Sequence, residues 1–157
     1  MRIELNSGVE TRFFAALREA GKREIGGMLF AEQLKPNHFT IIDFSLDPLS
    51  GSHASFHRDP ATHQTMLDQL FERTGRNFQR FNYLGEWHSH PSFSVHPSLH
   101  DIQTMTDIVE NRNSTLSFAV LLIVRLRLKF FVNRSITVFA RGRPPQRHPI
   151  AKRFGWT

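Results

Sequence analysis

The spacing of hydrophobic residues along the chain predicts three amphipathic helices, over 10–20, 59–75 and 97–113. Apolar side chains recur there three or four residues apart, which places them on one face of a helix. Asp59 as N-cap and Pro60 as first helical residue mark the start of the second helix. The predicted buried positions are Phe13, Leu17 and Ala20 in the first helix, Met66, Leu67, Leu70 and Phe71 in the second, and Leu99, Ile102, Met105 and Ile108 or Val109 in the third.

Short segments rich in β-branched and aromatic residues predict strands between and after these helices. They cover 24–34, 38–46, 81–90, 116–124, 126–132 and 135–141. The stretch "NRS" at 133–135 predicts the turn of an antiparallel hairpin, and the Pro-, Gly- and Ser-rich segment 47–58 predicts a loop. Basic residues alternate with apolar ones from Arg125 to Phe130, so we expect one wet and one buried face there. The mixture of helices and strands, with an antiparallel C-terminal part, gives the fold class α/β or α+β.

Length and composition limit the class of protein. The 157 residues suffice for one hydrophobic core, and we expect residues 1–157 to form a single domain. The chain has no cysteine, which fits a reducing compartment and excludes thiolate zinc sites. The N-terminus lacks the apolar run of a secretory signal, and the longest apolar run, 116–124, is too short to span a bilayer. We therefore expect a cytoplasmic protein that does not contact a membrane.

Positive charge is concentrated toward the C-terminus. Lys and Arg outnumber Asp and Glu by 20 to 14, and much of the excess follows Arg125. The stretch "RGRPPQRHPIAKRFGW" predicts a basic tail from about residue 141, either solvated or docking an acidic protein. A nucleic-acid binder is the alternative, but no nucleic-acid motif accompanies the tail, and only a steep loss of binding with salt would indicate one.

The segment 85–101, "GEWHSHPSFSVHPSLHD", gathers four of the nine histidines. His88 and His90 are two residues apart, and on a strand such residues point to the same face, where two imidazoles can share one metal ion. A tetrahedral catalytic zinc takes three protein ligands and keeps one position open for water. Asp101, in the first turn of the third predicted helix, is the best candidate for the third ligand, because the helix dipole favours a carboxylate there. The intervening segment must fold the chain back, and Pro91 and Pro97 stiffen that return.

Two alternatives stay open in this segment. His96 or His100 could replace Asp101 as ligand, although neither belongs to the strand pair. Ser98 and Asp101 also form a capping-box pattern, with Ser98 as N-cap, so helix capping alone would explain both residues. Capping does not explain the pair of histidines upstream.

The same residues carry a family resemblance. Residues 88–91, "HSHP", six further residues and "SLHD" at 98–101 fill the pattern H-[ST]-H-P-x6-S-x-x-D. This is the JAMM motif, and in it the chain resembles the MPN-domain zinc metalloproteases, a family of deubiquitinase-like isopeptidases. The order of elements is similar to that family over about residues 10–140, nearly the whole chain.

A second motif of that family lies upstream. Members carry a glutamate at the start of the strand after the first helix, in a pattern like E-x-x-G-x-L-x-G. The segment "EIGGMLFA" is similar, with Glu24, Gly27 and Leu29 at the matching positions. Ala31 stands where many members have the last glycine, a mild departure.

The resemblance implies a fold and a set of site residues. The fold is a cytidine-deaminase-like MPN domain, with a mixed, curved β-sheet flanked by helices. One Zn²⁺ ion would be bound by His88, His90 and Asp101. Glu24 would be the general base that takes a proton from the attacking water, and Ser98 would donate a hydrogen bond to the developing oxyanion.

Glu86 is a rival for the role of base. It lies two residues before His88 and so faces the same side of a regular strand. In the bacterial branch of the family, which "GEWHSHP" resembles, this acid is a supporting residue beside the ligands. Trp87 points away from His88 and is expected in the core.

The implied activity is cleavage of the bond after the C-terminus of a ubiquitin-like or otherwise C-terminally conjugated protein. The loops 47–59 and 91–97 are candidates for gripping an extended tail, with His53, His57 and His63 either lining that groove or solvated. Members of the short bacterial branch often accompany activating and conjugating enzymes, including those of antiphage defence, which makes such enzymes candidate partners. A metal hydrolase of a small amide or short peptide and a non-catalytic MPN scaffold stay as alternatives.

Overall fold

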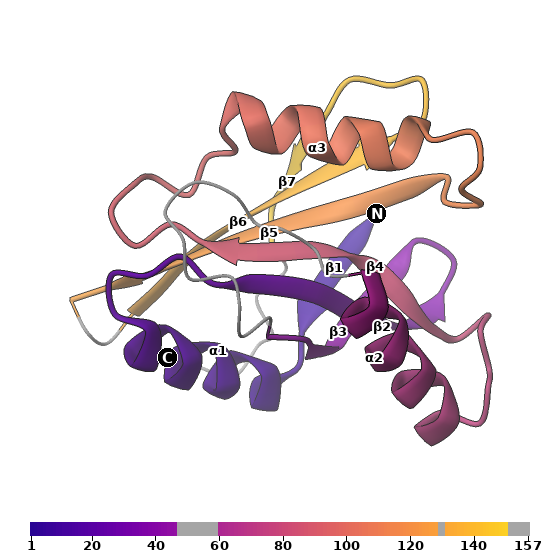
Figure 1. Cartoon of the computed structure of the whole chain (residues 1–157), viewed down its shortest axis with the longest axis horizontal. Coiled ribbons are helices and arrows are strands. Elements are labelled where there is room, and N and C mark those ends of the chain that lie inside the picture. The colour runs from indigo at the N-terminus through magenta and orange to yellow at the C-terminus, as the bar shows by residue number, and fades with distance from the viewer. Residues whose placement is uncertain (47–59, 129–130, 151–157) are drawn as a thin grey trace.

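The computed structural model describes residues 1–46, 60–128 and 131–150, which form a seven-stranded sheet with three helices (Figure 1). The strands are β1 (Arg2–Leu5), β2 (Gly26–Lys35), β3 (His38–Phe44), β4 (Phe81–Ser89), β5 (Phe118–Arg127), β6 (Phe131–Ala140) and β7 (Gln146–His148). The helices are α1 (Ser7–Ala20), α2 (Pro60–Arg73) and α3 (Leu99–Glu110). The predicted mixed sheet flanked by helices is confirmed.

The sheet has the strand order β1-β3-β2-β4-β5-β6-β7. β1 pairs with β3, and β4 with β5, in parallel, while the other neighbours are antiparallel. Two parallel neighbours need a crossover connection, and α3 lies in the crossover from β4 to β5. The histidine-rich segment is therefore the first part of this crossover, at the carboxyl end of β4, where α/β sheets commonly carry their sites.

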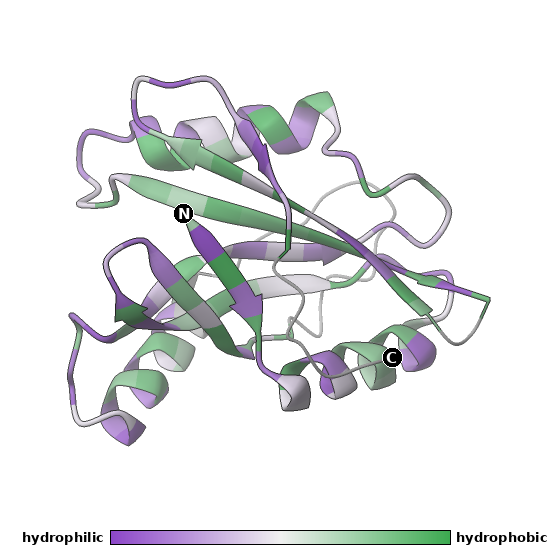
Figure 2. Cartoon of the chain, turned by 180° about the vertical axis from the view of Figure 1, so that it is seen from behind, coloured by the Kyte–Doolittle hydropathy of each residue, from purple (hydrophilic) through white to green (hydrophobic). Residues whose placement is uncertain are grey.

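The helices cover the sheet from both sides. On β5, Val120, Leu122 and Val124 belong to the hydrophobic cluster under α1, while Leu121 and Ile123 belong to the cluster under α3. Figure 1 shows α1 and α3 on opposite sides of the sheet. Because both faces of β5 are covered, the strand is hydrophobic along most of its length, whereas β7 is hydrophilic (Figure 2). α2 shares the α3 side, with Leu70 packed on Met28 and Phe30.

The N-terminal helix is longer than its hydrophobic pattern predicts. α1 begins at Ser7 because Asn6 is its N-cap and accepts the Gly8 N–H at 2.8 Å. The predicted inward residues Phe13, Leu17 and Ala20 are buried. β1, which precedes the helix, was not predicted, because its four residues are too few for a periodic signal.

The predicted hairpin turn at 133–135 is wrong. Arg127 pairs with Phe131 and Arg125 with Asn133, so the chain reverses between Arg127 and Phe131, and 133–135 lies inside β6. The polar residues there have tertiary partners instead of turn roles: the Arg134 guanidinium pairs with Glu10, and the Ser135 hydroxyl donates to a backbone carbonyl. The predicted strands 126–132 and 135–141 are therefore the end of β5 and one continuous β6.

Two further expectations are corrected in the C-terminal half. Leu99 is 87% exposed rather than inward, because the first turn of α3 lies beside the polar histidine segment and only later turns reach the apolar cluster of Met105 and Val109. Within the segment expected as a basic tail, Gln146–His148 forms the edge strand β7 on β6.

Some expectations lie outside the described residues. These are the loop at 47–58, the N-cap Asp59, the histidines His53 and His57, the side chain of His63, and the tail beyond residue 150. Among the helices that are described, none is long and apolar enough to cross a membrane.

Candidate metal centre

The end of β4 sets the direction of the two central histidines. Trp87 is fully buried, and its indole N–H donates to the Ser45 carbonyl at 2.8 Å, which confirms its predicted place in the core. Trp87 lies opposite Leu122 of the α1 cluster, whereas His88 lies opposite Ile123 of the α3 cluster. The alternation of side chains along a strand thus turns His88 toward the side of the sheet that carries α2 and α3.

The loop after β4 is fastened to the neighbouring strands. The Arg125 guanidinium of β5 donates to the Phe93 carbonyl at 2.8 Å, and the Ser135 hydroxyl of β6 donates to the Val95 carbonyl. The Val95 side chain is buried in the α3 cluster. These contacts make the loop return across the end of the sheet and bring the start of α3 to the histidines.

The first turn of α3 presents Asp101 to that loop. Ser98 is the N-cap, its Oγ accepts the Asp101 N–H at 3.1 Å, and an Asp101 carboxylate oxygen accepts the Ser98 N–H at 2.7 Å. The predicted capping box is therefore present. The oxygen that accepts the Ser98 N–H also faces His90, and the other carboxylate oxygen of Asp101 faces His88.

Three side chains converge at this point. The Nε2 atoms of His88 and His90 are 3.1 Å apart, and carboxylate oxygens of Asp101 lie 3.4 Å from the first and 3.7 Å from the second. Ligands held about 2.0–2.1 Å from one tetrahedral ion lie roughly 3.3 Å apart, so this donor set fits a single metal ion. Two imidazoles and a carboxylate are ligands that zinc accepts. Among the described residues this is the group that could hold a metal.

A backbone carbonyl fixes the orientation of His90. Its Nδ1 lies 2.7 Å from the Ser94 carbonyl oxygen, which can only accept, so Nδ1 carries the proton. The lone pair of His90 is therefore on Nε2, the atom that faces His88 and Asp101. Ser94 was missed by the sequence reasoning, because a backbone contact leaves no signal in residue type.

The electrostatics favour an ionised Asp101. Burial by itself raises the pKa of this carboxyl, but the hydrogen bond and charge of His88, together with the bonds from Ser98, outweigh burial and hold the pKa well below its usual range. The group is therefore a carboxylate, the form that binds a metal, throughout the neutral pH range.

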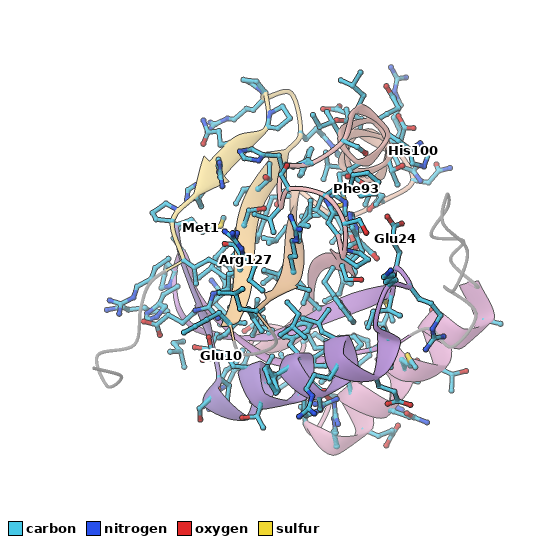
Figure 3. All side chains as sticks on the ribbon, turned by 90° about the vertical axis from the view of Figure 1, so that its left-hand side faces the viewer. Met1, Glu10, Glu24, Phe93, His100 and Arg127 are labelled. Atoms are coloured by element: carbon cyan, nitrogen blue, oxygen red, sulfur yellow. The ribbon has the colours of Figure 1, made fainter. Side chains whose placement is uncertain are left out.

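Glu24 lies next to the cluster without being part of it. Gly26 is opposite His88 in the antiparallel β2–β4 pair. The Ile25 carbonyl accepts the Ser89 N–H at 2.8 Å, and the Ile25 N–H donates to the Ser89 Oγ at 3.0 Å. Extending this register by one more residue places Glu24 opposite His90, on the same face. Figure 3 shows the Glu24 side chain pointing from the start of β2 toward the segment that carries Phe93 and His100.

The remaining polar residues of the segment lie elsewhere. His96 is exposed and bonded to Ser94 and Arg147, and His100 is exposed on the first turn of α3, so neither joins the ligand group. Glu86 is buried, faces the same side as His88 as predicted, and accepts the Tyr83 hydroxyl at 2.6 Å.

Comparisons with known proteins identify a family and a relative. Residues 6–136 match the family described as prokaryotic homologs of the JAB domain. A curated relative from Vibrio cholerae serotype O1, named CD-NTase/cGAS isopeptidase, is 30% identical over 125 residues, which cover 75% of this chain and 74% of the relative.

Solved structures are similar in fold. A protein from Desulfitobacterium hafniense has a TM-score of 0.70 at 19% identity and covers 95% of this chain and 91% of its own. One from Salinibacter ruber has a TM-score of 0.61 at 13% identity, covering 96% and 92%. A JAB1/MPN domain protein from Archaeoglobus fulgidus has a TM-score of 0.53 at 14% identity, covering 96% of both chains.

Proposed function

Because the chain belongs to the family of prokaryotic homologs of the JAB domain, within the JAB/MPN metalloproteases, we propose that it is a zinc-dependent isopeptidase. Its substrate is a ubiquitin-like, or otherwise C-terminally conjugated, protein, and the scissile bond follows the C-terminus of that protein. The convergence of His88, His90 and Asp101 on one point beside Glu24 carries the proposal. We place this activity in the cytoplasm, as the lack of cysteine suggests.

The donor set assigns roles to the residues of the site. His88, His90 and Asp101 would hold the zinc ion, which when bound lowers the pKa of a water molecule to about 7 and polarises the scissile carbonyl. Glu24 accepts a proton from the attacking water and delivers it to the leaving amine nitrogen as the C–N bond breaks. The Ser98 hydroxyl donates to the oxygen that gains negative charge at the scissile carbonyl. The products are a free carboxylate on the tail and a free amine on the target.

The surface beside the cluster suits a peptide tail. Phe93 is 63% exposed, and its ring stands edge-on to His90 with the ring centroids 6.3 Å apart. Leu99 is also exposed, on the first turn of α3 next to the cluster. Exposed apolar side chains near a polar centre can contact apolar residues of an extended chain. A small amide would use neither.

The name of the Vibrio cholerae relative suggests the target. We propose that the modified protein is of the CD-NTase/cGAS type and that enzymes that activate and conjugate the tail are partners in the same pathway, in a defence setting. The non-catalytic alternative is disfavoured, because the chain keeps every residue that the proposed reaction needs.

The test uses a ubiquitin-like protein joined through its C-terminus to a CD-NTase-type protein, with the intact masses of the products as readout. We expect the zinc-loaded chain to release both proteins, with masses that locate the bond after the C-terminus. Excess chelator and Glu24→Gln should each abolish release. Cleavage that survives the chelator would contradict the metal role, and an intact conjugate beside a cleaved short amide would favour the small-substrate alternative.

A further inference from the structure

Arg147 of the edge strand β7 contacts the loop of the metal centre. Arg147 pairs with Thr137 of β6, and directly opposite residues of an antiparallel pair share a face. Thr137 lies two residues from Ser135 and from Phe139, and the side chains of both point to the α3 side of the sheet. Arg147 therefore also projects to the α3 side, and its Nη1 lies 2.9 Å from Nε2 of His96.

The direction of each hydrogen bond follows from the donors present. A guanidinium group has only donors, so Nε2 of His96 accepts from Arg147 and the His96 proton is on Nδ1. Nδ1 lies 3.2 Å from the Ser94 Oγ and donates its hydrogen to it. The carbonyl of the same Ser94 accepts the Nδ1–H of His90 at 2.7 Å. One chain of bonds thus runs from the edge strand through His96 and Ser94 to His90.

The other hydrogen bonds that hold this loop involve the neighbours of Ser94 and not Ser94 itself. Arg125 binds the Phe93 carbonyl and Ser135 binds the Val95 carbonyl, so the residues on both sides of Ser94 are fixed to β5 and β6. Among the described residues, Ser94 forms its hydrogen bonds with His90 and His96. The side chain of His96 is exposed, and Arg147 limits the positions that it can take.

We propose that Arg147 is a positioning residue for the metal centre: through His96 and Ser94 it holds His90 with Nε2 directed at the metal. The proposal rests on the proposed function, since it concerns the same ligand. Direct hydrogen-bond partners of metal-binding histidines change metal affinity by roughly 10- to 100-fold. Arg147 acts two residues further away, at an exposed position, so its effect is smaller.

The test removes the guanidinium and measures zinc affinity with a chromophoric chelator as competitor. We expect Arg147→Met to weaken zinc binding about three- to tenfold, below the effect of a direct partner. Arg147→Lys keeps a donor and should recover part of the affinity. Arg143→Met, which removes an exposed arginine in the turn before β7, is the matched control and should bind zinc as tightly as the wild type. His96→Ala added to Arg147→Met should cause little further loss, because both changes break the same chain of bonds.

A second readout needs no metal. Long-range ¹H–¹⁵N spectra of the metal-free protein report the tautomer of each histidine, and we expect both His90 and His96 to be protonated on Nδ1 in the wild type. In Arg147→Met both should become mixtures, whereas a purely structural role would lower the melting temperature without changing either tautomer. Unchanged tautomers together with unchanged zinc affinity would overturn the proposal. A wild-type chain that binds no zinc would instead contradict the proposed function, and the tautomers would still decide the role of Arg147.

Discussion

Ser98 is the residue at which helix capping and the proposed chemistry meet. Its Oγ accepts the Asp101 N–H at 3.1 Å, and accepting uses a lone pair rather than the hydroxyl hydrogen. The same side chain can therefore cap α3 and donate to a developing oxyanion. The two roles, which the sequence leaves as alternatives, are compatible in this geometry.

Glycine separates these two roles, because it is a tolerable N-cap but has no hydroxyl. We expect Ser98→Gly to lower the free energy of unfolding by about 0.3 kcal/mol and kcat by about 100-fold. The Ser98 N–H that orients Asp101 belongs to the backbone and is kept. Urea unfolding and steady-state kinetics on the conjugate measure the two effects, with Ser98→Thr as the control that keeps both roles. An unchanged kcat in Ser98→Gly would mean that Ser98 is only a cap.

Gly27 illustrates what a motif can and cannot reveal about a residue. A Cβ at Gly27 would lie 2.0 Å from the Ser45 carbonyl oxygen, so a side chain does not fit between β2 and the end of β3. The resemblance locates this glycine at the correct position after Glu24. It cannot name Ser45 as the reason, because that contact forms only when the strands pair.

At the scale of elements, the sequence predicts best the segments whose own residues determine their structure. α2 and β4 follow the hydrophobic pattern within a few residues, because their buried faces are continuous. The edge strands β1 and β7, with four and three residues, are too short to show a pattern. The predicted hairpin turn at 133–135 is wrong because the Ser135 hydroxyl binds the distant Val95 carbonyl instead of forming a local turn.

Asp43 joins two elements that the sequence treats separately. Its carboxylate binds Arg12 of α1 and Arg73 of α2 at the end of β3. Burial alone raises the pKa of Asp43, but these guanidinium groups and the Phe44 N–H outweigh burial and lower the pKa below its ordinary value of 3.8. The stabilisation is therefore fully present above that ordinary pKa and is lost as pH falls through the lowered one.

We expect Asp43→Asn to lower the free energy of unfolding at pH 7 by about 1 kcal/mol, since both arginines are half exposed. The difference from the wild type should shrink below the ordinary pKa of Asp43 and vanish at lower pH still. Urea unfolding from pH 7 downward measures it, with Asp107→Asn, an exposed acid on α3, as control. A difference that stays constant with pH would mean that the charge of Asp43 is not responsible.

At the scale of the whole molecule, the site joins three separated parts of the chain. In the proposed site, Glu24 lies just before β2, the candidate ligands lie at the end of β4 and in the crossover after it, and Arg147 lies in the edge strand. The two motifs of the family predicted the first two groups by position. The return of Asp101 to the histidines also depends on Arg125 and Ser135, which bind the loop between them and belong to other strands. Arg147 could not be predicted, since its contact depends on the pairing of β7. That residues 1–157 form one domain stays a prediction.

The most direct test of the account is the zinc content of the purified chain by native mass spectrometry after reconstitution. We predict one zinc ion per chain in the wild type and in Glu24→Gln, because Glu24 is placed beside the ligands rather than among them. His88→Ala and Asp101→Ala should each lose the ion. Zinc retained at full stoichiometry by both ligand variants would contradict the assignment of the metal centre, as would its loss in Glu24→Gln.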